Sequence, residues 1–349
     1  MDKLLSYEQY KAAVSQAKAA GCKLSNCFFL PPAVEALIEK GTLYAQPIEN
    51  GLLLIDDNGG FYRLYYYLSD EAHYAPLSLD KDAVIEFPFT SQPNAKQQRQ
   101  IELIGELGFT LGRESALLSA VPDELKRLPM SDSPVELAKK GDAKRVLELI
   151  CASFNPLYAF IPEESELEEA IEDSRVFVIR ANGEIAAILH SGFEKGIAEI
   201  KHVAVCEQQR GKGLGAIIVN AYHEAYMDRA SGFQQWVDIH NTPAVNLYGR
   251  FGYSFSLRKA NEYILLRKGD NKMREKLLAL LEDIRPDVDF EHEKKLIDGK
   301  VLDSFDIISI VQEMNDTFDV EINVEDLEPD NFNTIEAMIE LIEKLQAED

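Results

Sequence analysis

The sequence predicts an α+β protein, with a mixed sheet flanked by helices over most of the chain and a small four-helix bundle at its end. Three observations predict this class. Runs typical of strands alternate with runs of helical periodicity up to about residue 268. After residue 272 only helical patterns occur. The charge also changes, because residues 281–349 contain 22 acidic and 5 basic residues in a chain of net charge −24.

Length and composition restrict the class of protein further. At 349 residues, two or three domains are expected rather than one core. No apolar run is long enough for a membrane span, and the start of the chain has the pattern of an amphipathic helix rather than a signal peptide. The acidic end argues against binding to nucleic acid, whose phosphates it would repel, and favours recognition by basic protein surfaces.

Cysteine and histidine usage indicates neither a disulfide framework nor a metal site. The four cysteines are scattered without the spacing of a metal finger, so a reduced, cytoplasmic setting is expected. The six histidines show no ligand spacing with cysteines or carboxylates, and we predict no metal. These residues are Cys22, Cys27, Cys151, Cys206, His73, His190, His202, His223, His240 and His292.

Residues 1–120 form the first predicted domain. A helical start is followed by the strand-like runs GLLLIDD and FYRLYYYL around the turn at residues 58–60. The run AVIEFPFT, a helix over 95–106 and the run GFTLGRESALLS follow. The polar segment VPDELKRLPMSDSP, at residues 121–134, has the composition of a linker.

Residues 135–268 form the second predicted domain. Two helices precede VFVIRANGEIAAILHSG, which predicts two strands joined by the turn Ala181-Asn182-Gly183. The strand AEIKHVAVC, a glycine-rich loop, a helix, the strand FQQWVDIH, a short helix and a final strand pair over 253–268 complete it. The residues GDNK predict a break before the third domain, residues 272–349.

The two large regions share a short internal similarity. LIGELGFTLGR, at 103–113, resembles LYGRFGYSFSLR, at 247–258, and each segment lies between a helix and a strand. Both regions also have a turn-linked strand pair upstream. We therefore interpret residues 1–120 as a shortened, diverged copy of residues 135–268.

Residues 210–215, RGKGLG, lie between a predicted strand and a predicted helix. Glycines let a backbone approach a ligand closely, and loop amides at a helix start direct positive charge at an anion. A diphosphate suits such a loop, and a tight glycine turn without a ligand is the alternative. The segment lacks the Gly-Lys-Ser/Thr ending of a nucleoside-triphosphate loop and follows a late strand, unlike a dinucleotide fingerprint.

The surroundings of this loop resemble the GNAT acyltransferase family over residues 135–268. AEIKHVAVCEQQRGKGLGAIIV matches the family's CoA-binding loop, and NTPAVNLYGRFGY matches its second motif. The resemblance implies acetyl-CoA or another acyl-CoA as the donor. It also implies a set of CoA-binding positions, which are Val203, Val205, Arg210, Gly211, Lys212, Gly213, Leu214, Gly215, Asn241 and Asn246.

The same resemblance implies two catalytic residues. An amine acceptor is protonated near neutral pH and must lose a proton before it attacks a thioester. Glu199 matches the strand position of a carboxylate base that works through water; an exposed strand glutamate is the alternative. Tyr248 matches the acid that protonates the departing CoA thiolate; a core tyrosine is the alternative. We expect alternation to place His202 on the opposite face from Glu199, and Thr242-Pro243 to cap the helix that carries Tyr248.

The first domain lacks both features. Ile104 stands where Tyr248 stands in the second, and only a short connection separates FYRLYYYL from AVIEFPFT, without a glycine-rich loop. We expect this copy to be structural or to shape the acceptor site. In the second domain, Tyr158 and Phe160 could line the acceptor entrance, although core packing is an alternative for both.

Ser304 begins a helical run in the acidic segment GKVLDSFDIISIV. A helix cap is the simple role for such a serine. The segment over 272–346 is however similar to acyl and peptidyl carrier proteins, in which Asp-Ser-Leu carries 4′-phosphopantetheine on the serine. Here the triplet is Asp303-Ser304-Phe305, and we expect Phe305 to pack under the helix. The phrases LDSFDII and FNTIEAM resemble carriers of amino acids, such as the D-alanyl type.

These resemblances predict an enzyme that combines CoA-dependent acyl transfer with a carrier. The building block on Ser304 would be acetylated on its amine, or the carrier would supply the acyl group to a diffusible amine. Alternatives are a loading acyltransferase, which moves acyl groups between CoA and the carrier thiol, and a non-catalytic CoA-binding scaffold. Expected partners are a phosphopantetheinyl transferase, an amino-acid-activating (adenylating) enzyme and other assembly-line enzymes.

Overall fold

The computed structural model describes residues 1–126, 134–266, 268–290, 293 and 295–348. The chain divides into two compact units, Met1–Leu77 with Asp82–Leu265, and Ser78–Lys81 with Leu266–Asp349. The strands, all in the first unit, are β1 (Asp2–Lys3), β2 (Leu24–Ser25), β3 (Leu43–Ile48), β4 (Gly51–Asp57), β5 (Phe61–Leu68), β6 (Asp82–Thr90), β7 (Thr110–Ala120), β8 (Val135–Leu137), β9 (Val176–Ala181), β10 (Glu184–Glu194), β11 (Ile197–Val205), β12 (Gly232–Asp238) and β13 (Ser254–Leu265).

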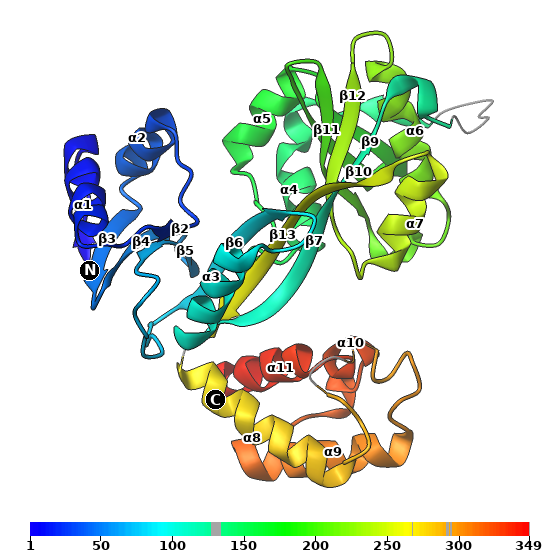
Figure 1. Ribbon diagram of the computed structural model, residues 1–349. Coiled ribbons are helices and arrows are strands. Elements are labelled where there is room, and N and C mark those ends of the chain that lie inside the picture. The colour runs from blue at the N-terminus through cyan, green and yellow to red at the C-terminus, as the bar shows by residue number, and fades with distance from the viewer. Residues whose placement is uncertain (127–133, 267, 291–292, 294, 349) are drawn as a thin grey trace. The chain divides into compact units, whose positions relative to one another are not determined.

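Seven described α-helices accompany these strands, and four more form the second unit. They are α1 (Tyr7–Ala19), α2 (Pro31–Lys40), α3 (Ala95–Glu106), α4 (Ala143–Cys151), α5 (Glu164–Glu172), α6 (Leu214–Tyr226), α7 (Thr242–Arg250), α8 (Lys268–Ile284), α9 (Ser304–Phe318), α10 (Pro329–Phe332) and α11 (Ile335–Glu348). A mixed sheet with flanking helices and a C-terminal helical region confirms the predicted α+β class (Figure 1).

All strands of the first unit belong to one mixed sheet, in the order β1-β3-β4-β5-β6-β13-β7-β12-β11-β10-β9-β8, with β2 beside β5. The two halves exchange their last strands. β7, from the amino-terminal half, pairs with β12, and β13, from the following half, pairs with β6. β7 and β13 also pair with each other at the centre of the sheet (Figure 1). The halves therefore share one continuous sheet.

Helices cover both faces of the sheet in the second half. Helices α4 and α5 pack on one face, through a cluster that includes Val146, Leu167, Val178 and Ala204. Helices α6 and α7 pack on the opposite face, through a cluster that contains Tyr222, Tyr248 and Phe251 (Figure 1). We call these the α4–α5 face and the α6–α7 face. Close packing of each apolar stripe against the sheet holds the elements that carry the site.

Many predicted elements are confirmed with their bounds. GLLLIDD and FYRLYYYL are β4 and β5, and the helix over 95–106 is α3. The turn that joins β9 and β10 has positive φ angles at Asn182 and Gly183, as a tight hairpin requires. Half of the expected linker at 121–134, residues 127–133, lies outside the described residues.

Two local predictions are wrong. The expected strand pair over 253–268 is one long strand, β13, because β6 and β7 pair with it from both sides and leave no room for it to fold back. GDNK does not break the chain but lies in the first turn of α8. Aspartate and asparagine are favourable at a helix start, so their low propensity in helix interiors did not apply.

The second unit has its own core. Buried residues of α8, α9 and α11, among them Leu281, Ile310, Met314 and Ile342, form one apolar cluster. Phe318, Val320 and Ile322 belong to the same cluster. The second unit therefore folds around an apolar core of its own.

Candidate functional site

The candidate donor site begins where two parallel strands separate. β11 pairs with β12 only from Ile197 to Glu199, and β11 then continues to Val205 without β12 beside it. On its other edge β11 stays paired with β10, and the Cys206 amide donates to the Ala186 carbonyl at 2.8 Å. Because bonding directions alternate along an antiparallel pair, the backbone groups of Val203 and Val205 face the gap. The Val205 carbonyl there accepts a bond from Arg210 Nε at 3.3 Å.

The glycine-rich loop lies at the end of this gap. Gly211 and Gly213 have φ angles of 76° and 79°, which glycine adopts without strain, and Gly213 caps α6. A Cβ at either position would meet no atom within 4 Å, so packing does not explain these glycines. The first amides of α6 have no carbonyl one turn earlier, so the loop presents donors that suit an anion.

A pocket of about 330 Å³ lies between this loop and α7. Seven predicted CoA-binding residues line it, namely Val205, Arg210, Gly211, Gly213, Leu214, Gly215 and Asn246. Of the other three, Lys212 donates to Gln209 Oε1 at 2.8 Å, and the backbone of Val203 faces the gap. Asn241 is the N-cap of α7, where its Oδ1 accepts from the Ala244 amide at 3.0 Å. Thr242 was expected to be that cap, and this prediction is wrong; Pro243 is in the first turn, as expected.

Sequence reasoning missed Arg250, which also lines this pocket. It lies four residues after Asn246 on α7, so the two share one helix face. This spacing within the second motif could have identified it. With Arg210, it gives the pocket two cations from different elements.

Tyr248 lies in the α6–α7 core rather than at the pocket surface. Its side chain is 2% exposed, and its ring packs edge-on to Tyr253 at 5.6 Å between centroids. Burial raises the pKa of Tyr248 above its ordinary value, and a hydrogen bond with Gln235 offsets this in part. Its neighbour Leu247 lines the pocket. The phenol is therefore protonated throughout the neutral range.

Glu199 lies at the last paired position before the strands separate. Its Oε1 accepts a bond from Gln234 Nε2 at 3.3 Å, and Gln234 is its partner on β12. Ala198 and Ile200, on either side of it, face the α6–α7 core. Glu199 therefore points to the α4–α5 face, which also carries the loop that contains Phe160.

His202 lies on the same face as Glu199, so the expected opposite placement is wrong. The pairing of β10 with β11 shifts by one residue, since His190 opposes His202 while Ser191 opposes Ile200. Lys201 is therefore an extra residue, a β-bulge, which reverses the alternation beyond it. His202 stacks on His190, and its Nε2 donates to the Phe160 carbonyl at 2.8 Å. This contact ties the loop before α5 to the sheet.

The amino-terminal half has the same separation of strands, but a side chain fills it. β5 and β6 pair only from Phe61 to Arg63. Asn26 Nδ2 donates to the carbonyls of Leu64 on β5 and Glu86 on β6, and its Oδ1 accepts from the Tyr66 amide at 2.9 Å. One side chain thus bonds the backbone of both strands along this gap. Ile104 is fully buried.

In the second unit, Ser304 is exposed at the first position of α9. The cap is Asp303, whose Oδ1 accepts from the amides of Phe305 and Asp306 at 2.7 and 3.0 Å. No hydrogen bond of the Ser304 hydroxyl is found among the described residues. Phe305 is 82% exposed, so the expectation that it packs under the helix is wrong. It follows the serine directly in the first turn of α9 and is exposed as well.

No group of three or more metal-binding side chains occurs within the described ranges, and His292 lies outside them. No described helix is long and apolar enough to span a bilayer.

Protein-family models match a segment within each of the two units. Residues 143–253 match the acetyltransferase (GNAT) family, and residues 299–342 match the phosphopantetheine attachment site. The chain thus contains a GNAT acetyltransferase domain followed by a phosphopantetheine attachment domain, as the two resemblances implied. GNAT domains bind acyl-CoA, and the attachment domain carries phosphopantetheine covalently on a serine. Such a carrier implies a phosphopantetheinyl transferase and assembly-line partners in general.

Among solved structures, the chain is similar to a tandem GNAT protein from the clavulanic acid biosynthesis pathway, with 11% identity, a TM-score of 0.45, and coverage of 76% of this chain and 97% of that one. It is also similar to a GCN5-related N-acetyltransferase from Sphaerobacter thermophilus, with 13% identity, a TM-score of 0.44, and coverage of 73% and 91%. None of the curated proteins matches the chain.

The residues present fit both groups. The open edge of β11, the amides of the loop and the cations Arg210 and Arg250 can receive a pantetheine with its diphosphate. The exposed hydroxyl of Ser304, which does not serve as a cap, can accept a prosthetic arm.

Proposed function

We propose that this chain is an acyl-CoA-dependent N-acyltransferase that acetylates the amine of a building block carried on its own or a partner's carrier domain. One observation carries the proposal: an open strand edge and a glycine loop that suit CoA occur in the same chain as an exposed serine that suits a pantetheine arm. Joining the two raises the effective concentration of each for the other.

In this proposal residues 135–268 form the transferase domain, residues 272–349 the carrier domain, and residues 1–120 shape the acceptor side. The amides of residues 211–215, with Arg210 and Lys212, hold the diphosphate of CoA. The backbone groups of Val203 and Val205 bond the pantetheine amides, since they face the gap. The Val205 amide can stabilise the oxyanion that forms on the thioester carbonyl.

The chemistry then needs one base and one acid. Glu199 takes a proton from the acceptor ammonium through a water molecule, and Gln234 holds its carboxylate at 3.3 Å. The free amine attacks the thioester carbonyl, the carbon–sulfur bond breaks, and the CoA thiolate receives a proton from Tyr248. The proton that the attacking nitrogen loses as the amide forms then restores the Tyr248 phenol through water. The raised pKa of Tyr248 keeps its proton available at neutral pH.

The proposed setting is the cytoplasm, and an adenylating enzyme is the proposed source of the building block. The experiment compares CoA-thiol release from acetyl-CoA by the phosphopantetheinylated protein loaded with an aminoacyl group, the unmodified protein and Ser304→Ala. Release only by the modified, loaded protein supports a carrier-bound acceptor. Release by all three with an added amine would mean a diffusible acceptor, and release by none would favour a CoA-binding scaffold.

A further inference from the structure

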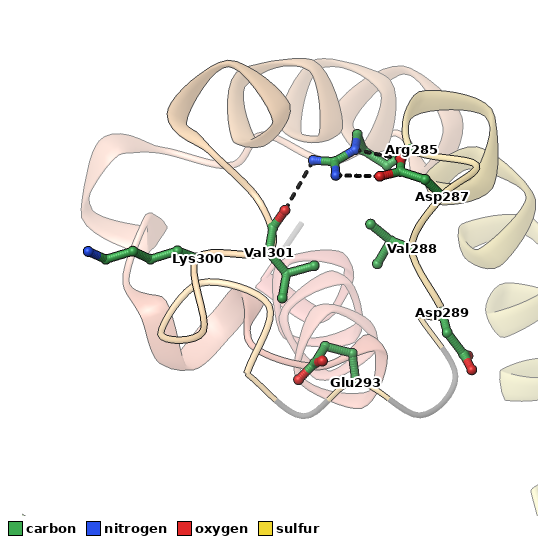
Figure 2. Close-up of a pocket in the computed structure, with 7 residues that line it drawn as sticks. All are labelled: Arg285, Asp287, Val288, Asp289, Glu293, Lys300 and Val301. Carbon is green, nitrogen blue, oxygen red and sulfur yellow. Dashed lines mark hydrogen bonds and ion pairs between the residues drawn. The ribbon is translucent and has the colours of Figure 1, made fainter.

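One arginine connects the end of α8 with the first turn of α9, where Ser304 lies. Arg285 follows directly after α8, and its Nε and Nη2 donate to both oxygens of Asp287 at 2.9 and 2.8 Å. Its Nη1 donates to the Val301 carbonyl at 3.0 Å and to Asp306 Oδ2 at 2.6 Å. Figure 2 shows the bonds to Asp287 and Val301. Arg285 thus holds three chain segments together.

The bond to Asp306 reaches the capping box around Ser304. Asp306 Oδ2 also accepts from the Asp303 amide at 2.9 Å, while Asp303 Oδ1 accepts from the Asp306 amide at 3.0 Å. These two reciprocal bonds join the residues on either side of the exposed Ser304. The Asp306 side chain is only 15% exposed, so solvent screens its charge less than that of a surface carboxylate.

Attachment of the arm brings negative charge to this position. The Ser304 oxygen forms a bond to a phosphorus of the CoA diphosphate, the bond from that phosphorus to the adenosine 3′,5′-bisphosphate breaks, and the serine proton passes to a base of the transferase. The carboxylates of Asp303 and Asp306 lie on either side of Ser304 in the sequence. A carboxylate without a cation beside it would repel the diphosphate as it approaches the serine oxygen.

We propose that Arg285 is a positioning residue for phosphopantetheinylation: it fixes the Asp303–Asp306 box and balances the Asp306 charge beside the attacking Ser304 hydroxyl. This inference rests on the proposed attachment at Ser304. Arg285 also lines the pocket drawn in Figure 2, which has no part in this role.

The test measures initial rates of holo-protein formation by intact mass, with CoA, a phosphopantetheinyl transferase and varied concentrations of the full-length chain. Arg285→Gln should lower kcat by about three- to tenfold, the size expected for one unbalanced charge in a partly solvated site. KM for the chain should not rise, because the variant is more acidic and a basic partner still docks. Ser304→Ala should gain no mass.

Two further variants separate charge from packing. Arg274→Gln is the matched control, since Arg274 bonds Glu336 at 2.7 Å and also links two helices of this unit; its kcat should equal that of the wild type. Asp306→Asn keeps an acceptor for the Asp303 amide but removes the charge. Arg285→Gln with Asp306→Asn should therefore recover most of the lost kcat.

Equal kcat for Arg285→Gln and Arg274→Gln, a loss expressed in KM alone, or no recovery in the double variant would overturn the inference. If Arg285→Gln loses helicity, the variants Arg285→Lys and Asp306→Asn are measured instead. Neither leaves an unbalanced carboxylate in the Asp303–Asp306 box, so the kcat of each should stay within about twofold of the wild-type value. A larger loss of kcat in either variant would overturn the inference. A wild-type chain that gains no mass would contradict the attachment at Ser304 itself, which is a separate failure.

Discussion

At the scale of single residues, Tyr248 places a phenol in a largely apolar core, where Gln235 is its hydrogen-bond partner. Its phenol is enclosed by the core that α6 and α7 share, and burial raises its pKa above the ordinary value of 10. Because the pKa is raised, the group keeps its proton as the pH increases through neutrality. Its protonation state should therefore not limit the reaction between pH 6 and about 9.

Replacing Tyr248 by phenylalanine tests this role. We expect Tyr248→Phe to lower kcat by about 10- to 100-fold, because the thiolate then leaves without a positioned acid. CoA affinity should not change, since the pocket is lined by other residues. Steady-state kinetics and calorimetric CoA binding measure the two quantities; unchanged turnover would remove Tyr248 from the mechanism.

The buried pair of His190 and His202 predicts a pH-dependent stability. Burial lowers the pKa of His202 to about 4 and, with the neighbouring histidine, that of His190 to about 3. Both folded-state pKa values are below the unfolded-state pKa near 6.5. As the pH falls below about 6.5, the unfolded state therefore binds more protons than the folded state. Stability is therefore complete above about pH 6.5 and is lost as the pH falls.

His202 alone should lower the free energy of unfolding by on the order of 3 kcal/mol when the pH falls from 7 to 4. Urea unfolding followed by Trp236 fluorescence at several pH values measures it in the first unit. His202→Gln keeps a donor for the Phe160 carbonyl but removes the titrating group. The free energy of unfolding of this variant should therefore change less with pH between about 6.5 and 4. An equally steep slope in that variant would contradict the assignment.

At the scale of elements, the loop before α6 and the turn between β4 and β5 form a matched pair. Gly213 and Gly59 both have positive φ angles, 79° and 83°, and a Cβ at either position would meet no atom within 4 Å. Alanine should cost each site about 1 kcal/mol of stability through backbone strain alone. Only Gly213→Ala should also weaken CoA binding, by about tenfold or more, because its Cβ would occupy the diphosphate position. Equal CoA affinities in both variants would contradict the assignment of the loop.

The two gaps between separating strands predict the stoichiometry of CoA. Asn26 bonds the backbone of both strands in the amino-terminal half, whereas the gap beside Val205 is open. One CoA should therefore bind per chain. Isothermal titration with a non-reactive CoA thioether measures the number of sites, and two equivalent sites would contradict the role of Asn26.

Elements and motifs were predictable where the signal is local. Strand β4, strand β5, helix α3 and the glycine loop follow from periodicity and turn residues within a few positions. The bulge at Lys201 could not be predicted, because an extra residue in one strand depends on the register of its partner. Likewise, both Asp303 and Ser304 can cap a helix, and only the backbone conformation decides between them.

At the scale of the whole molecule, the exchange of β7 and β13 joins the two halves of the first unit into one sheet. The sequence could not predict this, because either pairing buries the same apolar side chains and partners of a strand lie far away along the chain. As a consequence, β7 from the first half lies beside β12, whose Gln234 bonds Glu199. In the proposed mechanism, the first half therefore supports the strand next to the base.

The most direct test of the central claim loads Ser304 with aminoacyl-phosphopantetheine, using a small set of synthetic aminoacyl-CoA compounds and a permissive phosphopantetheinyl transferase. The loaded chain then receives acetyl-CoA with an isotope-labelled acetyl group, and the peptide that contains Ser304 is analysed by mass spectrometry. The account predicts labelled acetyl on the amine of the carried residue, absent in Tyr248→Phe. Label on the bare arm thiol alone, or no label on this peptide while a free amine is acetylated, would contradict it.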